Sequence, residues 1–98
     1  MDVECNFFGP IRDVVGTKTI VHELPPGTTV TELVTDLDET YDGVADQLLK
    51  GESELADNLV ITVDGRNVRQ LDGEETILDD GAVVRISPSV GGGGTEPI

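Results

Sequence analysis

The amino-acid sequence predicts an α+β domain in which one main helix packs on one face of a mixed sheet of about five strands. Three observations lead to this prediction. Several short segments alternate apolar and polar residues, as half-buried strands do. One longer segment carries apolar residues at helical spacing, and 98 residues are enough for a single domain. We expect the folded domain at 1–88 and a flexible glycine-rich tail at 89–98.

The first two strands are predicted at residues 2–8 and 17–24. Gly9-Pro10 breaks the first strand, and residues 11–15 form at most a short helical turn before the second. The two strands are therefore expected to pair as an antiparallel hairpin. Alternation in the first strand turns Val3, Cys5 and Phe7 toward the core and Glu4, Asn6 and Phe8 outward. Phe8 on the outer side either packs at the rim of the domain or belongs to a docking surface.

The main helix is predicted to begin at a capping box and to run to about Tyr41. Thr29 can cap the helix, and the Glu32 side chain can bond back to the Thr29 backbone. The apolar stripe expected to face the sheet comprises Val30, Leu33, Val34, Leu37 and Tyr41, with the acidic Asp36, Asp38 and Glu39 on the wet face. Residues 36–42 do not form a calcium loop, because the sixth position is Tyr41 rather than glycine and the apolar stripe runs through it.

The second half of the chain is predicted to add a short helix and three more strands. In order, the expected elements are a helix at 44–49, a polar connection at 50–58, a central strand at 59–64, a short return strand at 66–69, a segment at 71–78 pinned to the core by Ile77 and Leu78, and a last strand at 82–87. One amphipathic helix must bury its stripe against such a sheet. This order of elements is that of a β-grasp domain.

The charge balance is strongly acidic and excludes several kinds of partner. The chain has 20 Asp and Glu against 6 Lys and Arg, a formal net charge of −14. Binding to nucleic acid or to an anionic membrane needs a basic footprint that this chain lacks. The acidic residues are spread along the chain, which is typical of proteins that work in concentrated salt, where self-repulsion is screened. We therefore expect a halophilic cytoplasm, an acidic protein whose partner carries a basic patch, or both.

The single cysteine and the single histidine are both expected to be structural. One cysteine, Cys5, allows no disulfide and no multi-cysteine metal or iron–sulfur site. Free cysteines are usually buried small apolar residues. His22 falls on the alternation with Ile20 and Leu24, so it is expected to be a partly buried strand residue rather than a ligand. Neither a signal peptide nor a membrane span is recognised, which predicts a soluble, cytoplasmic protein.

Four consecutive glycines, Gly91 to Gly94, follow Pro88-Ser89-Val90 near the end of the chain. Glycine has no Cβ, so four in a row make a thin peptide that cannot form a core. Two interpretations remain open at this point. The segment is either a linker or frayed terminus, or a tail shaped to enter a narrow channel of another protein, where its carboxyl group is modified.

Taken together, the sequence resembles the ubiquitin-like sulfur carriers of the molybdopterin-synthase small-subunit (MoaD/ThiS-like) type, and in particular the small archaeal modifier proteins. The resemblance covers nearly the whole chain. It is carried by the order and spacing of Phe7-Phe8-Gly9, Ile11 to Gly16, Thr28-Thr29-Val30, Asp38 to Gly43, Asn58 to Gly65, Leu78 to Gly81 and Pro88-Ser89-Val90 before the glycines.

The resemblance implies a carrier protein that is not itself an enzyme. An E1-like partner uses ATP to adenylate the C-terminal glycine carboxylate. The activated glycine then either takes sulfur as a thiocarboxylate, for molybdopterin synthesis or tRNA thiolation, or forms an isopeptide bond with a lysine of a target protein. No cofactor or metal is expected on the carrier, which is expected to be a monomer.

This sequence departs from the family pattern at its end, because residues follow the glycines. A processing protease would have to cut first. The family pattern makes Gly91 a spacer and Gly92-Gly93 the terminal pair, with Gly94 to Ile98 removed; cuts after Gly92 or Gly94 remain open. Residues 95–98 are either native or an artificial addition.

The same comparison implies a docking face on the outer side of the sheet. Its predicted residues are Phe8, Val60, Val83 and Arg85. Relatives often carry an aromatic residue where this chain has Ser87, so a more polar interface is expected here. The alternative function is a non-catalytic β-grasp interaction domain with an inert tail. A ferredoxin-type electron carrier is excluded by the single cysteine.

Overall fold

The computed structural model describes residues 1–50, 54–56 and 58–88, and the predicted tail lies outside this part of the chain. The elements are β1 (Asp2–Phe7), α1 (Pro10–Val15), β2 (Thr19–Glu23), α2 (Val30–Thr40), α3 (Val44–Leu48), β3 (Leu49–Lys50), β4 (Glu54–Leu55), β5 (Leu59–Val63), β6 (Arg66–Asn67), two 3₁₀ turns (Val68–Gln70 and Gly73–Glu75) and β7 (Val83–Pro88).

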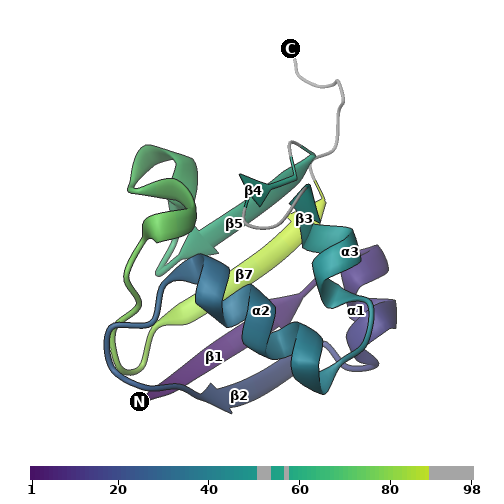
Figure 1. Ribbon diagram of the computed structural model, residues 1–98, viewed down its shortest axis with the longest axis horizontal. Helices are drawn as coiled ribbons and strands as arrows, with labels where there is room; N and C mark the ends of the chain where they lie inside the picture. Colours follow the sequence, from purple (N-terminus) through teal and green to yellow (C-terminus); the bar gives the residue numbers. More distant parts are fainter. Residues whose placement is uncertain (51–53, 57, 89–98) are drawn as a thin grey trace.

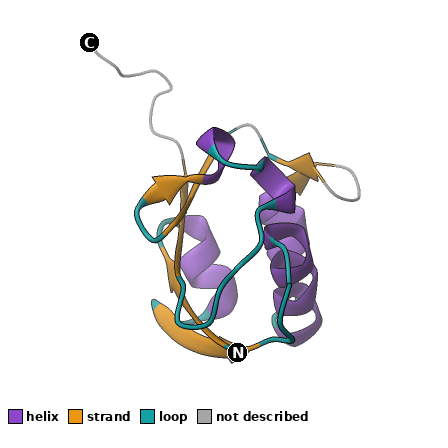
Figure 2. Ribbon diagram, turned by 90° about the vertical axis from the view of Figure 1, so that its left-hand side faces the viewer, coloured by secondary structure: helices purple, strands orange, loops and turns teal. Residues whose placement is uncertain are grey.

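The main sheet has five strands in the order β2-β1-β7-β5-β6 (Figure 1). The first and last strands, β1 and β7, lie side by side and run parallel, while the other pairs are antiparallel. Helix α2 crosses one face of this sheet, and no helix of comparable length in the described residues lies on the opposite face (Figures 1 and 2). The predicted mixed sheet of about five strands with one main helix is confirmed.

The core lies between α2 and the sheet and contains the residues predicted to face inward. Val3, Cys5 and Phe7 of β1 are fully buried, and so are Val84 and Ile86 of β7. From α2, the side chains of Val30, Leu33, Val34 and Leu37 are also fully buried, while Tyr41 only packs against the edge of the core. All of these core residues lie within the described domain, upstream of the glycines.

The predicted capping box fixes the start of α2. Thr29 Oγ1 accepts a hydrogen bond from the Glu32 backbone N–H at 3.2 Å, and Glu32 Oε1 accepts one from the Thr29 N–H at 2.9 Å. Two backbone donors that the helix cannot satisfy itself are thereby paired. The cap therefore sets the register in which the apolar stripe meets the sheet.

Several sequence-based boundaries were wrong. The connection at 50–58 is not wholly polar loop, because β3 and β4 pair Leu49 with Leu55 and bury Leu55. The predicted return strand at 66–69 is a strand only over Arg66–Asn67 and then turns into a 3₁₀ helix. The first departure arises from pairing between segments that carry little alternation of their own, and in the second the Asn67 side chain accepts a hydrogen bond from the Arg69 N–H and caps the 3₁₀ helix.

The burial of two residues also differs from the prediction. Ile77 was expected to pin its segment to the core, yet it is 60% exposed, because Thr76 and Leu78 on either side of it take the buried positions. Asn6 faces outward as predicted but is buried rather than exposed. Its Oδ1 accepts a hydrogen bond from Thr19 Oγ1 at 2.7 Å, and its Nδ2 donates one to Glu4 Oε2 at 3.0 Å.

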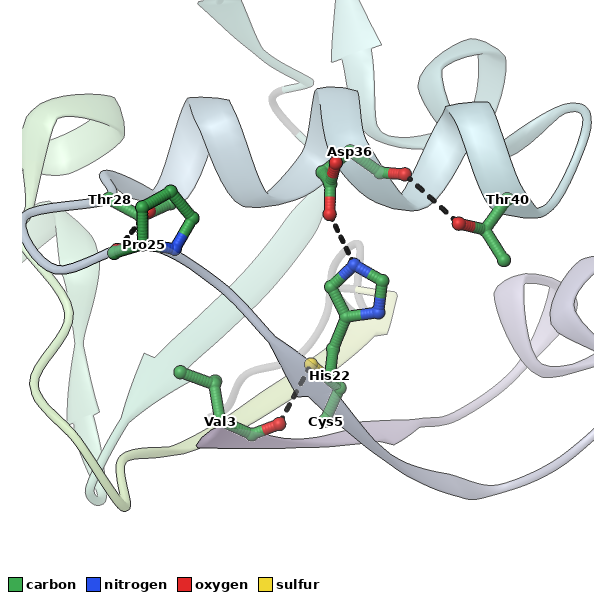
Figure 3. Close-up of polar contacts among 7 residues, drawn as sticks. All are labelled: Val3, Cys5, His22, Pro25, Thr28, Asp36 and Thr40. Atoms are coloured by element: carbon green, nitrogen blue, oxygen red, sulfur yellow. Dashed lines mark hydrogen bonds and ion pairs between the residues drawn. The ribbon is translucent and has the colours of Figure 1, made fainter. Parts of the chain in front are cut away.

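The two residues expected to be structural behave so in the described chain. His22 is partly buried, and its ring Nε2 contacts the Asp36 carboxylate across the gap between β2 and α2 (Figure 3). This contact links the edge strand to the main helix. Cys5 is fully buried on the inner face of β1, with its Sγ 4.0 Å from the Val3 carbonyl oxygen (Figure 3).

Candidate docking face

The outward side chains of β5, β7 and the end of β1 form a groove on the face of the sheet opposite α2. The strand register places Val60 beside Ser87, and Thr62 beside Arg85. The groove has a volume of about 770 Å³ and is lined by Phe8, Gly9, Val60, Thr62, Gly65, Val83, Arg85, Ser87 and Pro88. A concave, largely apolar surface of this size can receive side chains of a partner.

One end of the groove is fixed by the residues that follow β1. The Phe8 backbone N–H donates a hydrogen bond to the Ile86 carbonyl at 3.0 Å, which holds Phe8 beside the end of β7. Gly9 has a φ of 68°, and a Cβ at this position would lie 2.8 Å from the ring atoms of Pro88. Glycine is therefore needed at position 9, both for its backbone conformation and for the close approach of Pro88.

The other end of the groove is held by a pair of hydrogen bonds between Asp64 and Val83. Asp64 Oδ1 accepts from the Val83 backbone N–H at 2.9 Å, and the Asp64 N–H donates to the Val83 carbonyl at 2.9 Å. The turn after β5 is thereby fastened to the start of β7. Both ends of the groove are thus anchored by hydrogen bonds, from the backbone at Phe8 and from the backbone and side chain of Asp64, so its shape is largely preformed.

The charge of the groove differs from that of the rest of the molecule. Its described lining contains Arg85 and no acidic residue, although the chain has 20 Asp and Glu. A second cation lies at its edge, where Lys18 Nζ is 5.5 Å from the centroid of the Phe8 ring. A cation at this distance from an aromatic ring is attracted to it.

The four residues predicted as docking residues are brought together in this one groove. Phe8, Val60 and Val83 are half-buried, and Arg85 is exposed. Gly91 to Gly94, the predicted reactive segment, lie outside the described residues. Pro88 lines the groove, and the glycines follow it after two residues. The last described residue, Pro88, therefore lies at the groove.

Sequence reasoning missed four parts of this lining, namely Gly9, Thr62, Gly65 and Pro88. Gly9 was interpreted only as a strand breaker, and Pro88 only as the end of the last strand. Thr62 could have been found, because it alternates with Ile61 and Val63 in the central strand and must face outward. The closeness of Gly9 and Pro88 depends on the parallel pairing of β1 and β7, which has no local sequence signal.

The described residues offer no obvious catalytic group. Burial, and to a lesser degree the negative charge of Glu4, raise the pKa of Cys5 from its ordinary value of 9.0 to about 12. Because the thiolate is the nucleophilic form, this cysteine is unreactive in the folded domain. Within residues 1–50, 54–56 and 58–88, no group of three or more His, Cys, Asp or Glu side chains could hold a metal ion. None of the helices described here has the length and apolar character needed to cross a membrane.

A β-grasp domain with a groove on its bare sheet face and glycines beyond its last strand has the architecture expected from the resemblance to ubiquitin-like carriers. This chain belongs to the ThiS family, whose model matches residues 5–93. The predicted family is therefore confirmed.

The similarity to individual proteins supports the same family assignment. The chain is 38% identical over 93 residues to small archaeal modifier protein 3 of Haloferax volcanii, covering 95% of this chain and 100% of that protein. It is also similar to the solution structure of the Haloferax volcanii HVO 2177 protein, with a TM-score of 0.83, 38% identity, and coverage of 95% of this chain and 87% of that one. A chain of the BexX/CysO complex of Amycolatopsis orientalis has a TM-score of 0.78 at 28% identity, covering 93% and 99% of the two chains.

Proposed function

We propose that this chain is a ubiquitin-like modifier and sulfur carrier whose working group is a C-terminal glycine carboxylate. The predicted class, a carrier rather than an enzyme, agrees with the relatives, which include a small archaeal modifier protein and a CysO complex. One observation carries the proposal further. The predicted docking residues share a groove whose lining includes Pro88, and only Ser89 and Val90 separate Pro88 from the glycines in the sequence.

The chemistry requires activation by a second protein. A carboxylate is a poor acyl donor at neutral pH. In the proposed reaction an E1-like enzyme binds ATP, one oxygen of the glycine carboxylate attacks the α-phosphorus, and pyrophosphate leaves. The resulting acyl adenylate carries AMP as a good leaving group. The enzyme stabilises the charge that develops in this step, while the carrier supplies a terminus thin enough to reach the nucleotide and a face by which to dock.

The activated glycine has two proposed fates, which share the same acyl adenylate. In one, hydrosulfide attacks the acyl carbon and AMP leaves, which gives a thiocarboxylate that a sulfur-accepting synthase subunit then consumes. Alternatively, the glycyl group passes through a thioester to the amine of a lysine on a target protein and forms an isopeptide bond. Both reactions are proposed to take place in the cytoplasm of a halophile, which suits a relative from Haloferax volcanii.

A processing step must precede activation, because Thr95-Glu96-Pro97-Ile98 follow the glycines. We propose that a protease hydrolyses the bond after Gly93 and exposes its carboxylate. The match to the ThiS family ends at Gly93, which supports this position over Gly92 and Gly94. Gly91 then serves as the spacer before the terminal Gly92-Gly93 pair.

ATP-dependent activation tests the proposal. Chains ending at Gly92, Gly93 or Gly94 would be mixed with the E1-like enzyme of the native host, and the exchange of labelled pyrophosphate into ATP would be measured. We expect exchange with the chain ending at Gly93 and its loss in Gly93→Val, because a branched side chain obstructs a narrow channel.

The melting temperature of Gly93→Val should equal that of the unchanged chain, since the buried apolar residues of the described chain run from Val3 to Ile86. Full exchange by Gly93→Val would contradict the assignment of the tail. Absence of exchange with all three chain ends would favour the alternative, an interaction domain with an inert tail.

A further inference from the structure

A second hollow lies between the end of β5 and the segment that follows the two 3₁₀ turns. Its volume is about 440 Å³, and its described lining shares no residue with that of the groove. Pro88 pairs with Leu59 at the start of β5, whereas the hollow lies beside Val63 at the end of that strand (Figure 1). It is therefore a separate surface from the groove at Pro88.

The hollow gathers exposed apolar side chains. Three large apolar residues of the described chain are exposed, and two of them, Leu71 and Ile77, line this hollow. Ile77 is exposed because Thr76 and Leu78 on either side of it take the buried positions. Exposed apolar side chains that gather in one hollow indicate a contact surface, whereas single ones need no explanation.

The backbone of Ile77 adds unpaired hydrogen-bonding groups to this surface. Ile77 forms an isolated antiparallel bridge with Thr29, and the two hydrogen bonds that hold the bridge, 2.9 and 3.0 Å long, join the neighbours of these residues rather than the two themselves. In such a non-hydrogen-bonded pair, the N–H and C=O of Ile77 point away from Thr29. Neither group has a hydrogen-bond partner in the described chain. They form a short strand edge to which an extended segment can bond.

The rim of the hollow is acidic. Three carboxylates, those of Asp64, Asp72 and Asp79, line it against one cation, Arg66, and none of the three is ion-paired within the described chain. Asp64 Oδ1 accepts a hydrogen bond from the Val83 N–H. Like charges on one rim repel each other, and a positively charged side chain placed among them relieves this repulsion.

We propose that this hollow binds an extended segment of a partner protein that carries an apolar side chain between two basic ones. The apolar side chain covers Leu71 and Ile77, the basic ones meet the acidic rim, and the backbone bonds to the N–H and C=O of Ile77. A second copy of this chain is a poor occupant, because its net charge is −14 with only 6 Lys and Arg. The inference goes beyond the proposed function and stands independently of it.

The test titrates the full chain with the peptide acetyl-Arg-Ile-Arg-Ile-Arg-amide, in the lowest salt concentration at which the chain is folded, and follows the amide NMR shifts. We expect the shifts to be confined to residues 63–66, 71–72 and 76–79. The dissociation constant should rise about fivefold or more in Ile77→Ser, which loses the apolar contact. It should rise about two- to fivefold in Asp72→Asn, which removes one charge from the rim.

Two matched variants change residues outside the hollow. Val21→Ser alters the third exposed large apolar side chain of the described chain, 65% exposed against 60% for Ile77. Asp42→Asn removes an exposed carboxylate just after α2. Both variants should bind the peptide like the unchanged chain. The peptide acetyl-Glu-Ile-Glu-Ile-Glu-amide should not bind, and methylation of the backbone nitrogens of the arginine peptide should weaken it, because the Ile77 carbonyl then loses its donor.

Several results would overturn the inference. These are shifts spread over the whole surface, equal effects of Ile77→Ser and Val21→Ser, or equal binding of the two peptides. A dimer in sedimentation that Ile77→Ser dissociates would assign the hollow to a second copy. If the arginine peptide inhibited pyrophosphate exchange by the unchanged chain but not by Ile77→Ser, the hollow would belong to the activating enzyme.

Failure of the proposed function gives a different result. Absence of exchange by the unchanged chain would remove that function and leave peptide binding by the hollow in place. Circular dichroism melts of each variant separate loss of binding from loss of folding.

Discussion

The two faces of the sheet are built from the same strands but serve different purposes. On β7, Val84 is fully buried against α2, while its neighbour Val83 is half-buried on the outer face and lines the groove. On β1, Cys5 and Phe7 are likewise buried while Phe8, after the strand, faces the groove. Adjacent residues thus divide between the core and the groove, because side chains of a strand alternate between its faces.

The outer face of the sheet also carries apolar residues, and these do not belong to the core. Val60, Val83 and Phe8 cover a groove that no element of the described chain fills. In a chain of net charge −14, such a surface requires a reason. The proposed docking of a partner supplies that reason, and matched substitutions on the two faces test it.

The largest expected effect on stability comes from Val84→Ala on the inner face. Removing two methyl groups from a fully buried site loses their burial and leaves a cavity. We expect the free energy of unfolding to fall by about 1.5–3 kcal/mol. Urea denaturation followed by circular dichroism measures this change, and a loss below the error of the method would contradict the description of the core.

The same substitution one residue earlier should act on binding instead. Val83→Ala removes part of the apolar wall of the groove, so the KM for activation is expected to rise about three- to tenfold. Its free energy of unfolding should change by less than about 1 kcal/mol, because Val83 faces outward. If Val83→Ala destabilised the fold as much as Val84→Ala, or left the KM unchanged, the division between the faces would not hold.

A smaller effect is expected from the titration of Cys5 on the inner face. Burial raises the pKa of Cys5 to about 12, so between its ordinary value of 9.0 and about 12 the folded chain holds a proton that the unfolded chain releases. Stability must therefore fall as the pH rises through this window and must not depend on Cys5 below it. By about pH 10 we expect Cys5 to account for a loss of about 1 kcal/mol.

Cys5→Ala is the matched control for this effect, since it lacks the thiol but keeps the other groups that titrate in alkali. The difference in urea midpoint between the two chains, measured at several pH values, isolates the thiol. A difference that stays constant from neutral to alkaline pH would mean that Cys5 is not buried as described.

The sequence predicted those parts of the fold that depend on local patterns. Alternation identified Val3, Cys5 and Phe7 as core residues, and the capping box at Thr29 and Glu32 located the start of α2. The outward positions of Phe8, Val60, Val83 and Arg85 also followed from alternation. Each of these predictions needed only the period of a strand or a helix.

Features that depend on segments far apart in the chain could not be predicted. The contact of His22 with Asp36 requires knowing that β2 lies beside α2. The burial of Leu55 requires β3 and β4 to pair, and the contact of Gly9 with Pro88 requires β1 and β7 to be parallel neighbours. Which outward residues share a groove is likewise set by strand order, not by any one strand.

The most direct test of the central claim is the intact mass of this protein purified from its native host. The account predicts a chain that ends at Gly93, with one oxygen replaced by sulfur in part of the sample, or conjugates in which target lysines carry a glycine remnant. A mass that retains residues 94–98 under every growth condition, with no thiocarboxylate and no modified lysines, would contradict it and leave an interaction domain with an inert tail.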